Sequence, residues 1–288
     1  MNNGYLKALF PMVGGKWRLS RKLVKLIPEH QTYVEVFGGS GALLFTKPPS
    51  DVECINDIDE EIVNFFRVLQ KPDTVARLLR ELQLIPYSRK VYEEACLSEV
   101  PQKPVLRAKR FFIIAKMVWG GYRSGGSKSG QTPGRWRFSV GNHCAGSKEV
   151  KQFRRTINEL DRFAARLLGV YIERSDFRKV LKQWDRPYTF FFVDPPYVGS
   201  EGYYAGNFSE DDHRALAENL NKIEGKAMVT YYPDALVDEL YPDTKWSRVL
   251  FSSTKNAHCS LPGGQKEKVV EIALLNYELN VGQMSLFS

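Results

Sequence analysis

Short apolar runs alternate with helical patterns along the chain. In residues 60–69 the apolar positions Ile62, Val63, Phe66 and Leu69 recur three and four residues apart, which predicts a helix. A further helix is expected over residues 210–223. The apolar runs predict strands at 33–37, 52–55, 170–173, 189–193, 227–231, 248–251 and 269–277. Because strands alternate with helices, we expect an α/β fold on an open, mostly parallel sheet.

The first predicted strand ends in the glycine turn of residues 38–41, and the apolar residues 42–45 then predict the start of a helix. A dinucleotide-binding fingerprint would need glycine at Leu44, and a phosphate-binding loop would need a Gly-Lys-Ser/Thr triplet that is absent, so NAD and ATP are disfavoured. Asp57 follows the second strand, where a carboxylate can accept hydrogen bonds from the ribose of an adenosine-containing cofactor. The alternative role for Asp57 is a helix N-cap.

The spacing of these motifs predicts an insertion. Gly41 lies 153 positions before Asp194, whereas three strand–helix units need roughly 90 residues. The surplus begins with helical patterns at 75–82 and 105–119 and continues as a stretch rich in Gly, Ser and Arg at 120–146. We therefore expect a core of residues 1–71 and 152–288, with a mainly helical and loop-rich inserted domain of residues 72–151.

Positive charge is concentrated in this insertion. The whole chain has 41 basic and 33 acidic residues, a net charge of +8. Residues 103–155 contain thirteen basic residues against one acid, Glu149, and they interleave aromatic residues with glycine and serine. This mixture is suited to contacts with phosphates and bases, although a solvated basic face would have the same composition. The candidate DNA-binding residues are Arg123, Lys128, Arg135, Trp136 and Arg137.

Cysteine and histidine spacing argues against a metal site. The four cysteines lie more than forty residues apart, so there is no CxxC pair and no small disulfide framework, and the four histidines are equally scattered. The apolar stretches are far shorter than the ~18 residues that span a bilayer. We expect no metal, no membrane span and no secretion signal, and hence a cytoplasmic protein.

The most specific motif is Asp194-Pro195-Pro196-Tyr197, which follows the nearly continuous apolar strand of residues 189–193. An exocyclic amino nitrogen is a poor nucleophile, because its lone pair is delocalised into the ring. A carboxylate and a backbone carbonyl can hold its two protons and aim the lone pair at an electrophile. The prolines stiffen the loop, and the tyrosine ring offers a face to a base flipped out of the duplex. The alternative is a rigid turn without chemistry.

These motifs together resemble the DNA adenine methylase family of N6-adenine methyltransferases. The resemblance covers almost the whole chain in motif order, through residues 14–16, 35–41, 56–59, 176–177 and 194–197. It implies a Rossmann-like, seven-stranded methyltransferase core that uses S-adenosylmethionine. It also implies a target-recognition insertion between the second strand and the strand before Asp194, which is where the basic excess lies.

The resemblance also implies roles for individual residues. Asp57 would bind the cofactor ribose, Asp176 the adenine amino group of the cofactor, and Phe177 would lie beside that adenine. Asp194 and Tyr197 resemble the catalytic pair, within the catalytic segment Asp194, Pro195, Pro196 and Tyr197. The cofactor-binding residues would be Met12, Gly15, Lys16, Phe37, Gly38, Gly39, Gly41, Asp57, Ile58, Asp176, Phe177 and Asp194. The chain departs from the family at Met12, where an aromatic residue is frequent, and at residues 119–141, which replace an Asn- and Phe-rich recognition segment.

The leading hypothesis is therefore methyl transfer from S-adenosylmethionine to N6 of a flipped-out adenine in double-stranded DNA, by direct in-line attack. A cytosine-C5 enzyme would need a Pro-Cys pair, and no cysteine follows a proline. N4-cytosine methylation uses the same amino-group logic and is the enzymatic alternative, and a non-catalytic DNA-binding protein on a methyltransferase shell is the other. We expect a monomer of bacterial or phage origin, with a role in restriction-modification among its candidate roles.

The C-terminal residues Gln283-Met284-Ser285-Leu286-Phe287 are unusually apolar for a tail. They resemble the short peptide with which bacterial replication and repair proteins dock on the β sliding clamp. Such a tether would raise the effective concentration of the enzyme on newly replicated DNA. Folding back onto the core is the alternative.

Overall fold

The sheet expected from the sequence is present in the computed structural model, which describes residues 6, 8–123, 134–138, 148–254 and 268–279. These residues form a seven-stranded sheet in the order β3-β2-β1-β4-β5-β7-β6. Strands β1 to β5 pair in parallel, and β7 is antiparallel to both β5 and β6. The strands are β1 (Thr32–Glu35), β2 (Val52–Asn56), β3 (Val170–Glu173), β4 (Thr189–Val193), β5 (Lys226–Tyr231), β6 (Ser247–Thr254) and β7 (Lys268–Leu275).

Strand order reverses between β1 and β4. The chain runs outward from β1 through β2 to β3, and then returns to place β4 on the other side of β1, with Glu35 opposite Phe192. At such a reversal the loops that follow the two central strands diverge and leave a crevice at the carboxyl ends of the strands. The glycine turn after β1 and Asp194 after β4 are therefore brought to the same edge of the sheet.

Helices cover both faces of the sheet. Successive side chains of a strand point to opposite faces, and on β4 Phe190 and Phe192 pack in one core with α1, while Phe191 and Val193 pack in another with α7 and α8. None of the helices in the described ranges is both long and apolar enough to cross a membrane. The helices around the sheet are α1 (Trp17–Leu23), η1 (Val24–Leu26), α2 (Glu60–Gln70), α7 (Phe177–Trp184), η2 (Glu201–Tyr203), α8 (Glu210–Leu220) and α9 (Ala235–Leu240).

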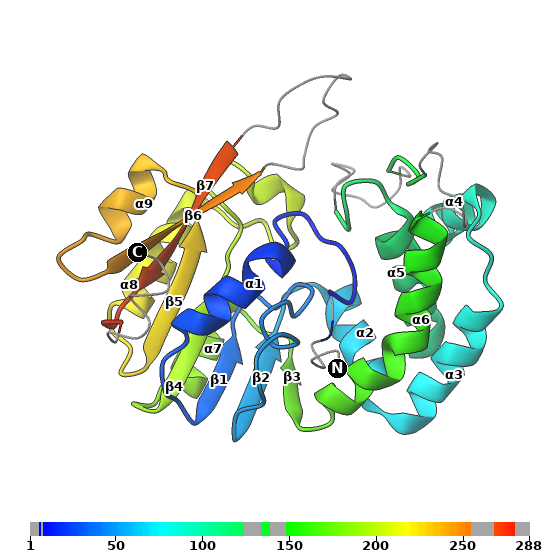
Figure 1. Ribbon diagram of the computed structural model, residues 1–288, viewed down its shortest axis with the longest axis horizontal. Coiled ribbons are helices and arrows are strands. Elements are labelled where there is room, and N and C mark those ends of the chain that lie inside the picture. Colours follow the sequence, from blue (N-terminus) through cyan, green and yellow to red (C-terminus); the bar gives the residue numbers. More distant parts are fainter. Residues whose placement is uncertain (1–5, 7, 124–133, 139–147, 255–267, 280–288) are drawn as a thin grey trace.

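Four more helices lie together beyond the β3 edge, on the right of Figure 1. They are α3 (Pro72–Gln83), α4 (Arg89–Leu97), α5 (Pro104–Met117) and α6 (Lys148–Leu167). Helix α2 packs against α3, α5 and α6, so the group is joined to the core through α2. Helix α6 runs across residue 151, the expected end of the insertion, and the limits 72–151 stay a prediction.

The prediction that a helix begins at residues 42–45 is wrong, because residues 39–46 form turns. Two helical-type hydrogen bonds do form, from Phe45 N to Gly41 O and from Lys47 N to Leu43 O. Pro48 and Pro49 then stop the segment, since proline cannot donate the next bonds and forces the preceding residue into extended backbone.

Candidate active site

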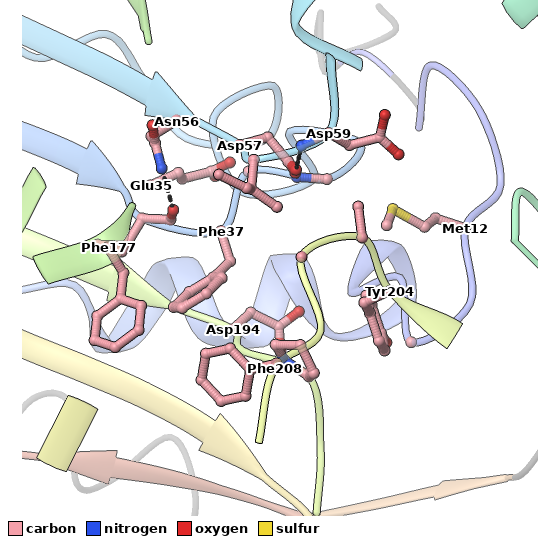
Figure 2. A pocket seen from close by; sticks show the side chains of 18 of the residues that line it. Met12, Glu35, Phe37, Asn56, Asp57, Asp59, Phe177, Asp194, Tyr204 and Phe208 are labelled. Carbon is pink, nitrogen blue, oxygen red and sulfur yellow. Dashed lines mark hydrogen bonds between the residues drawn. The ribbon is translucent and has the colours of Figure 1, made fainter. Parts of the chain in front are cut away.

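A pocket opens at the carboxyl ends of β1, β2 and β4, and its volume is about 1020 Å³ when the space open to solvent is included. Figure 2 shows Phe37, Phe177 and Phe208 on one side of it and Met12 and Tyr204 on another. Most of the residues predicted to bind a cofactor line this one cavity. They are Met12, Gly15, Lys16, Phe37, Gly38, Gly39, Asp57, Ile58, Asp176, Phe177 and Asp194.

The glycine turn allows the backbone to approach both the pocket and β2. A Cβ on Gly38 would lie 2.4 Å from Cγ1 of Ile55, so no larger residue fits there. Gly39 and Gly41 have φ angles of +50° and +66°, in the left-handed region that glycine adopts readily. Gly41 does not line the pocket, but a Cβ there would meet the ring of Phe45, so it shapes the turn from behind.

Glu35 ends β1 as a fully buried carboxyl group on the floor of the pocket. Its Oε1 accepts hydrogen bonds from Tyr33 Oη and Leu44 N, each at 2.7 Å. Burial raises the pKa of Glu35 to about 7, because the two hydrogen bonds offset only part of the lost hydration of the charged form. The backbone just after the glycine turn is thus held, at Leu44 N, by a buried acid whose pKa is close to neutral pH.

Asp57 and Asp59 form a linked pair at the end of β2. Asp57 accepts hydrogen bonds from Gly39 N at 2.7 Å and from Asp59 N at 2.8 Å, and the second of these is drawn in Figure 2. Burial raises the pKa of Asp57 to about 6. The N-cap of α2 is Asp59, which accepts from Glu61 N. The N-cap alternative considered for Asp57 therefore belongs to Asp59, and Asp57 faces the pocket.

Three phenylalanine rings form the apolar wall of the pocket. The ring centroids of Phe37, Phe177 and Phe208 lie 5.7 to 5.8 Å from one another. Asp176 lines the pocket beside them, while its carboxylate also caps α7 by accepting from Arg178 N at 2.8 Å. One end of the pocket therefore offers aromatic rings against which a planar ligand group can pack. It also offers a carboxylate that can accept hydrogen bonds from the edge of that group.

Asp194 lies at the other end, immediately after β4. Lys16 Nζ lies 2.8 Å from Asp194 Oδ1, and Thr230 Oγ1 donates to the same oxygen at 2.7 Å. Lys16 is 4% exposed, and its ammonium group also donates to Gly14 O and lies 3.7 Å from Glu271 Oε2. Lys16, predicted from the resemblance to lie on the cofactor side, thus contacts the predicted catalytic carboxylate directly.

Tyr197 is buried rather than open to the pocket. Its ring packs edge-on against Tyr232 at 4.6 Å, and Lys16 Nζ lies 4.6 Å from the ring centroid. Its hydroxyl donates to Glu271 Oε2 at 3.4 Å. In the described part of the chain the pocket lining includes Asp194 and Pro196 but not Tyr197 or Pro195. Stacking of Tyr197 on a flipped base stays a prediction.

The predicted DNA-binding residues fall into separate places. Arg123 lines the pocket, where Nη2 lies 2.6 Å from Asp59 Oδ2. Arg135 is exposed and lies over the ring of Trp119, which is itself 48% exposed. The ring of Trp136 stacks on Phe138 at 5.4 Å. Lys128 lies outside the described residues.

Arg137 and Trp136 are held in place by contacts with α4, α5 and Tyr87. Arg137 N donates to Met117 O at the end of α5, and Arg137 O accepts from Tyr87 Oη, each at 2.7 Å. The guanidinium of Arg89, at the start of α4, lies 5.0 Å from the ring centroid of Trp136. Arg89 was not among the predicted DNA-binding residues, because no motif of the sequence links it to Trp136.

The sequence did not predict several residues of the pocket and of the contact between Asp194 and Lys16. Thr230 and Glu271 reach Asp194 and Lys16 from β5 and β7, and Tyr204 and Phe208 line the pocket from the segment after β4. The positions of Thr230 and Glu271 depend on strand order rather than on any local motif. Glu35 was part of the recognised motif, and a lone acid at the end of a buried strand was the available signal.

Comparisons with known proteins show the family of the chain. The family model described as D12 class N6 adenine-specific DNA methyltransferase matches residues 13–255. The Type II methyltransferase M1.LlaDCHI of Lactococcus lactis subsp. cremoris is 26% identical over 289 residues, which cover 94% of this chain and 96% of that protein. The DNA N-6-adenine-methyltransferase of Escherichia phage P1 is 29% identical over 65 residues, 23% of this chain and 8% of that protein. The chain belongs to the D12 class of N6 adenine-specific DNA methyltransferases.

Proposed function

We propose that the pocket binds S-adenosylmethionine and presents its methyl group to the amino group of an adenine held at Asp194. Family membership makes the chain an adenine-specific DNA methyltransferase and implies S-adenosylmethionine as the methyl donor. The observation that carries the assignment of the site is the continuity of one cavity, which is lined at one end by Asp57, Asp176 and Phe177 and at the other by Asp194.

The chemistry of the lining fits the cofactor. Asp57 can accept hydrogen bonds from ribose hydroxyls, because each carboxylate oxygen has two lone pairs and uses one for Gly39 N or Asp59 N. Phe37 and Phe177 provide ring faces for adenine, and Asp176 provides an acceptor for its amino group. When bound, the cofactor supplies an electrophilic methyl group on a sulfonium centre. We assign Met12, Gly15, Ile58, Gly38 and Gly39 to the walls around it.

Asp194 is then the residue that holds the target amino group. In the described part of the chain, Lys16 and Thr230 both contact Oδ1. Oδ2 is thereby left to accept an N6–H of the target adenine, and a backbone carbonyl of the proline segment Pro195-Pro196 accepts the other. A fixed carboxylate that interacts more strongly with the developing positive charge on nitrogen than with the neutral amine lowers the barrier to transfer.

The positive charge of Lys16 also fixes the carboxylates around Asp194. Lys16 Nζ lies between two carboxylates, Asp194 and Glu271, and keeps both of them in place. Burial, together with these carboxylates, holds the pKa of Tyr197 well above its ordinary value, so its hydroxyl stays protonated. Tyr197 therefore acts as a neutral hydrogen-bond donor to Glu271 in this arrangement.

The insertion, taken as residues 72–151, is proposed to contact double-stranded DNA through Lys128, Arg135, Trp136 and Arg137. Exposed arginine beside aromatic rings favours this assignment. We propose that the enzyme is a monomer, and that it serves as the modification enzyme of a restriction-modification pair, as the Type II name of the Lactococcus relative suggests. N4-cytosine methylation receives no support from the comparisons.

The tail motif Gln283–Phe287 lies outside the described residues, and docking on the β sliding clamp stays a proposal. A pull-down of purified clamp by the full chain, repeated with Leu286→Ala and Phe287→Ala, tests it. Binding that is lost in both variants supports docking. Absence of binding by the unaltered chain contradicts docking, and a loss of folding stability in the double variant supports packing of the tail on the core.

Nucleoside analysis tests the function itself. Unmethylated DNA is incubated with the purified enzyme and S-adenosylmethionine, digested to nucleosides and assayed for N6-methyladenine and N4-methylcytosine. We expect N6-methyladenine alone. Calorimetric titration with S-adenosylhomocysteine tests the cofactor assignment separately, with Asp57→Ala as the variant that weakens binding and Asp194→Asn as the variant that retains it.

A further inference from the structure

A short segment after α5 reaches from the insertion into the pocket region. Tyr122 N donates to Pro11 O at 2.8 Å, and Val13 N donates to Tyr122 O at 3.4 Å. A Cβ on Gly121, which has a φ of +98°, would lie 3.0 Å from Met12 N, so only glycine allows this close approach. The segment is therefore seated directly beside Met12, one of the residues that line the pocket.

The next residue, Arg123, forms an ion pair with Asp59. Its Nε and Nη2 lie 3.1 and 2.6 Å from Asp59 Oδ2, and Tyr122 Oη donates to the same oxygen at 3.3 Å. Arg123 is 26% exposed and Asp59 6% exposed, so the pair is largely shielded from water. Arg123 has a φ of +69°, a left-handed backbone that is strained for a side-chain-bearing residue. Such a conformation persists where surrounding contacts hold it.

Asp59 transmits this contact to the predicted ribose acceptor. Asp59 N donates to Asp57 Oδ1 at 2.8 Å, while Gly39 N donates to Oδ2 at 2.7 Å. The charges also interact. Beyond the effect of burial, the Asp59 carboxylate raises the pKa of Asp57 and the Arg123 guanidinium lowers it. Arg123 therefore favours both the position and the ionised form of Asp57.

We propose that Arg123 is a positioning residue that couples DNA contact by the insertion to cofactor binding, by holding Asp59 and, through it, Asp57. The inference rests on the proposed function, since it takes the pocket to hold S-adenosylmethionine and the basic residues that follow Arg123 in the chain to contact DNA. An insertion held on DNA keeps the Arg123–Asp59 pair formed. A displaced segment leaves Asp59 without its cation and Asp57 less suited to the ribose.

This assignment differs from the role predicted for Arg123 from the sequence, which was contact with DNA. The Arg123 guanidinium uses Nε and Nη2 to bind the buried Asp59 carboxylate, so it has fewer N–H groups left to bind a phosphate. Coupling between two sites is reciprocal, so bound cofactor should tighten DNA binding by the same factor by which bound DNA tightens cofactor binding.

The test measures the Kd of S-adenosylhomocysteine by calorimetry, with and without saturating fragments of unmethylated genomic DNA. For the unaltered enzyme we expect tighter binding when DNA is present. For Arg123→Gln we expect a Kd about tenfold weaker and no longer dependent on DNA. Arg107→Gln is the matched control, because Arg107 joins α5 to Glu60 and Glu61 at the same end of α2 without lining the pocket. Its Kd and its DNA dependence should stay unchanged.

A pH profile separates positioning from a loss of structure. Without Arg123 the pKa of Asp57 rises, so the pH below which S-adenosylhomocysteine binding weakens should move upward. Arg123→Lys keeps a positive charge and should restore the original profile. A fold damaged by the substitution would weaken binding equally at every pH and would lower the melting temperature, and that result would overturn the proposal.

Two further results would also overturn it. Arg123→Gln could retain the Kd and the DNA dependence of the unaltered enzyme. Alternatively, it could leave the Kd unchanged and reduce the salt dependence of DNA binding by about 0.9, the slope change expected for one lost phosphate contact. Failure of the unaltered enzyme to bind S-adenosylhomocysteine would contradict the proposed function itself, which is a different observation.

Discussion

Lys16 Nζ lies 2.8 Å from Asp194 Oδ1, so a residue from the N-terminal motif is paired with the first residue of the motif after β4, 178 positions later. The pairing connects two motifs that the sequence presents as separate. It also makes one oxygen of Asp194 different from the other, because Thr230 donates to Oδ1 as well.

This pairing predicts the effect of removing the lysine. Lys16→Gln should lower kcat by about a hundredfold, since Asp194 would lose the charge that fixes its orientation and would face Glu271 without a cation between them. The Kd of S-adenosylhomocysteine should change much less. Single-turnover methylation assays and calorimetry measure the two quantities. A large loss of affinity with kcat unchanged would return Lys16 to the cofactor side, where the family resemblance placed it.

Asp57 should control affinity rather than catalysis. Asp57→Ala removes an acceptor for ribose hydroxyls and the partner of Gly39 N. We expect weaker S-adenosylhomocysteine binding by about tenfold to a hundredfold, in line with one or two lost hydrogen bonds to a charged group. Binding to the unaltered enzyme should also weaken below about pH 6, where Asp57 becomes protonated. A normal Kd for the variant in calorimetry would refute the assignment.

Glu35 should make stability depend on pH. Its pKa is raised from 4.5 to about 7 in the folded protein, so its contribution to stability is fully present below pH 4.5 and is lost as pH rises through 7. Glu35→Gln keeps an acceptor for Tyr33 and Leu44 but cannot ionise. Between pH 4.5 and pH 8 the unaltered protein should lose about 3 kcal/mol of unfolding free energy relative to this variant. Urea unfolding of both proteins at the two pH values provides the measurement, and parallel pH profiles would contradict the prediction.

Arg135 and Arg137 should contribute to DNA affinity. Each phosphate contact that is removed by substitution with glutamine should lower the slope of log K against log salt by about 0.9. If either arginine reads a guanine edge, the loss should instead fall mainly on the cognate site. Filter binding at several salt concentrations, on cognate and unrelated duplexes, distinguishes the two. An unchanged slope with unchanged specificity would mark these residues as a solvated face.

The sequence predicted the sheet well, because each strand is a local apolar run bounded by turn residues. It also located Asp57, Asp176 and Asp194. Asp57 and Asp194 directly follow β2 and β4, Asp176 lies three residues after the end of β3, and parallel strands bring their carboxyl ends together. Local patterns carry no information about which strands are neighbours, and the contact of Glu271 with Lys16 depends on β7 lying beside β5.

Burial and side-chain partners were the other unpredictable quantities. The packing of Tyr197 against Tyr231 and Tyr232, with Lys16 over its ring, could not be read from the sequence, and the stacking of Tyr197 on a flipped base stays a prediction. Arg123 was counted with the basic DNA-binding residues, and its partner Asp59 lies 64 residues away in the chain. Charge alone could not show that this arginine has a buried carboxylate beside it.

The central claim is that Asp194 acts on the target adenine and not on the cofactor. Its most direct test combines two measurements on Asp194→Asn: N6-methyladenine formed in unmethylated DNA, and the Kd of S-adenosylhomocysteine. We predict that methylation falls by at least about a thousandfold while the Kd stays within about tenfold of the original value. Equal losses of methylation and of affinity would show that Asp194 serves the cofactor instead, and retained methylation would show that Asp194 has no role in the reaction.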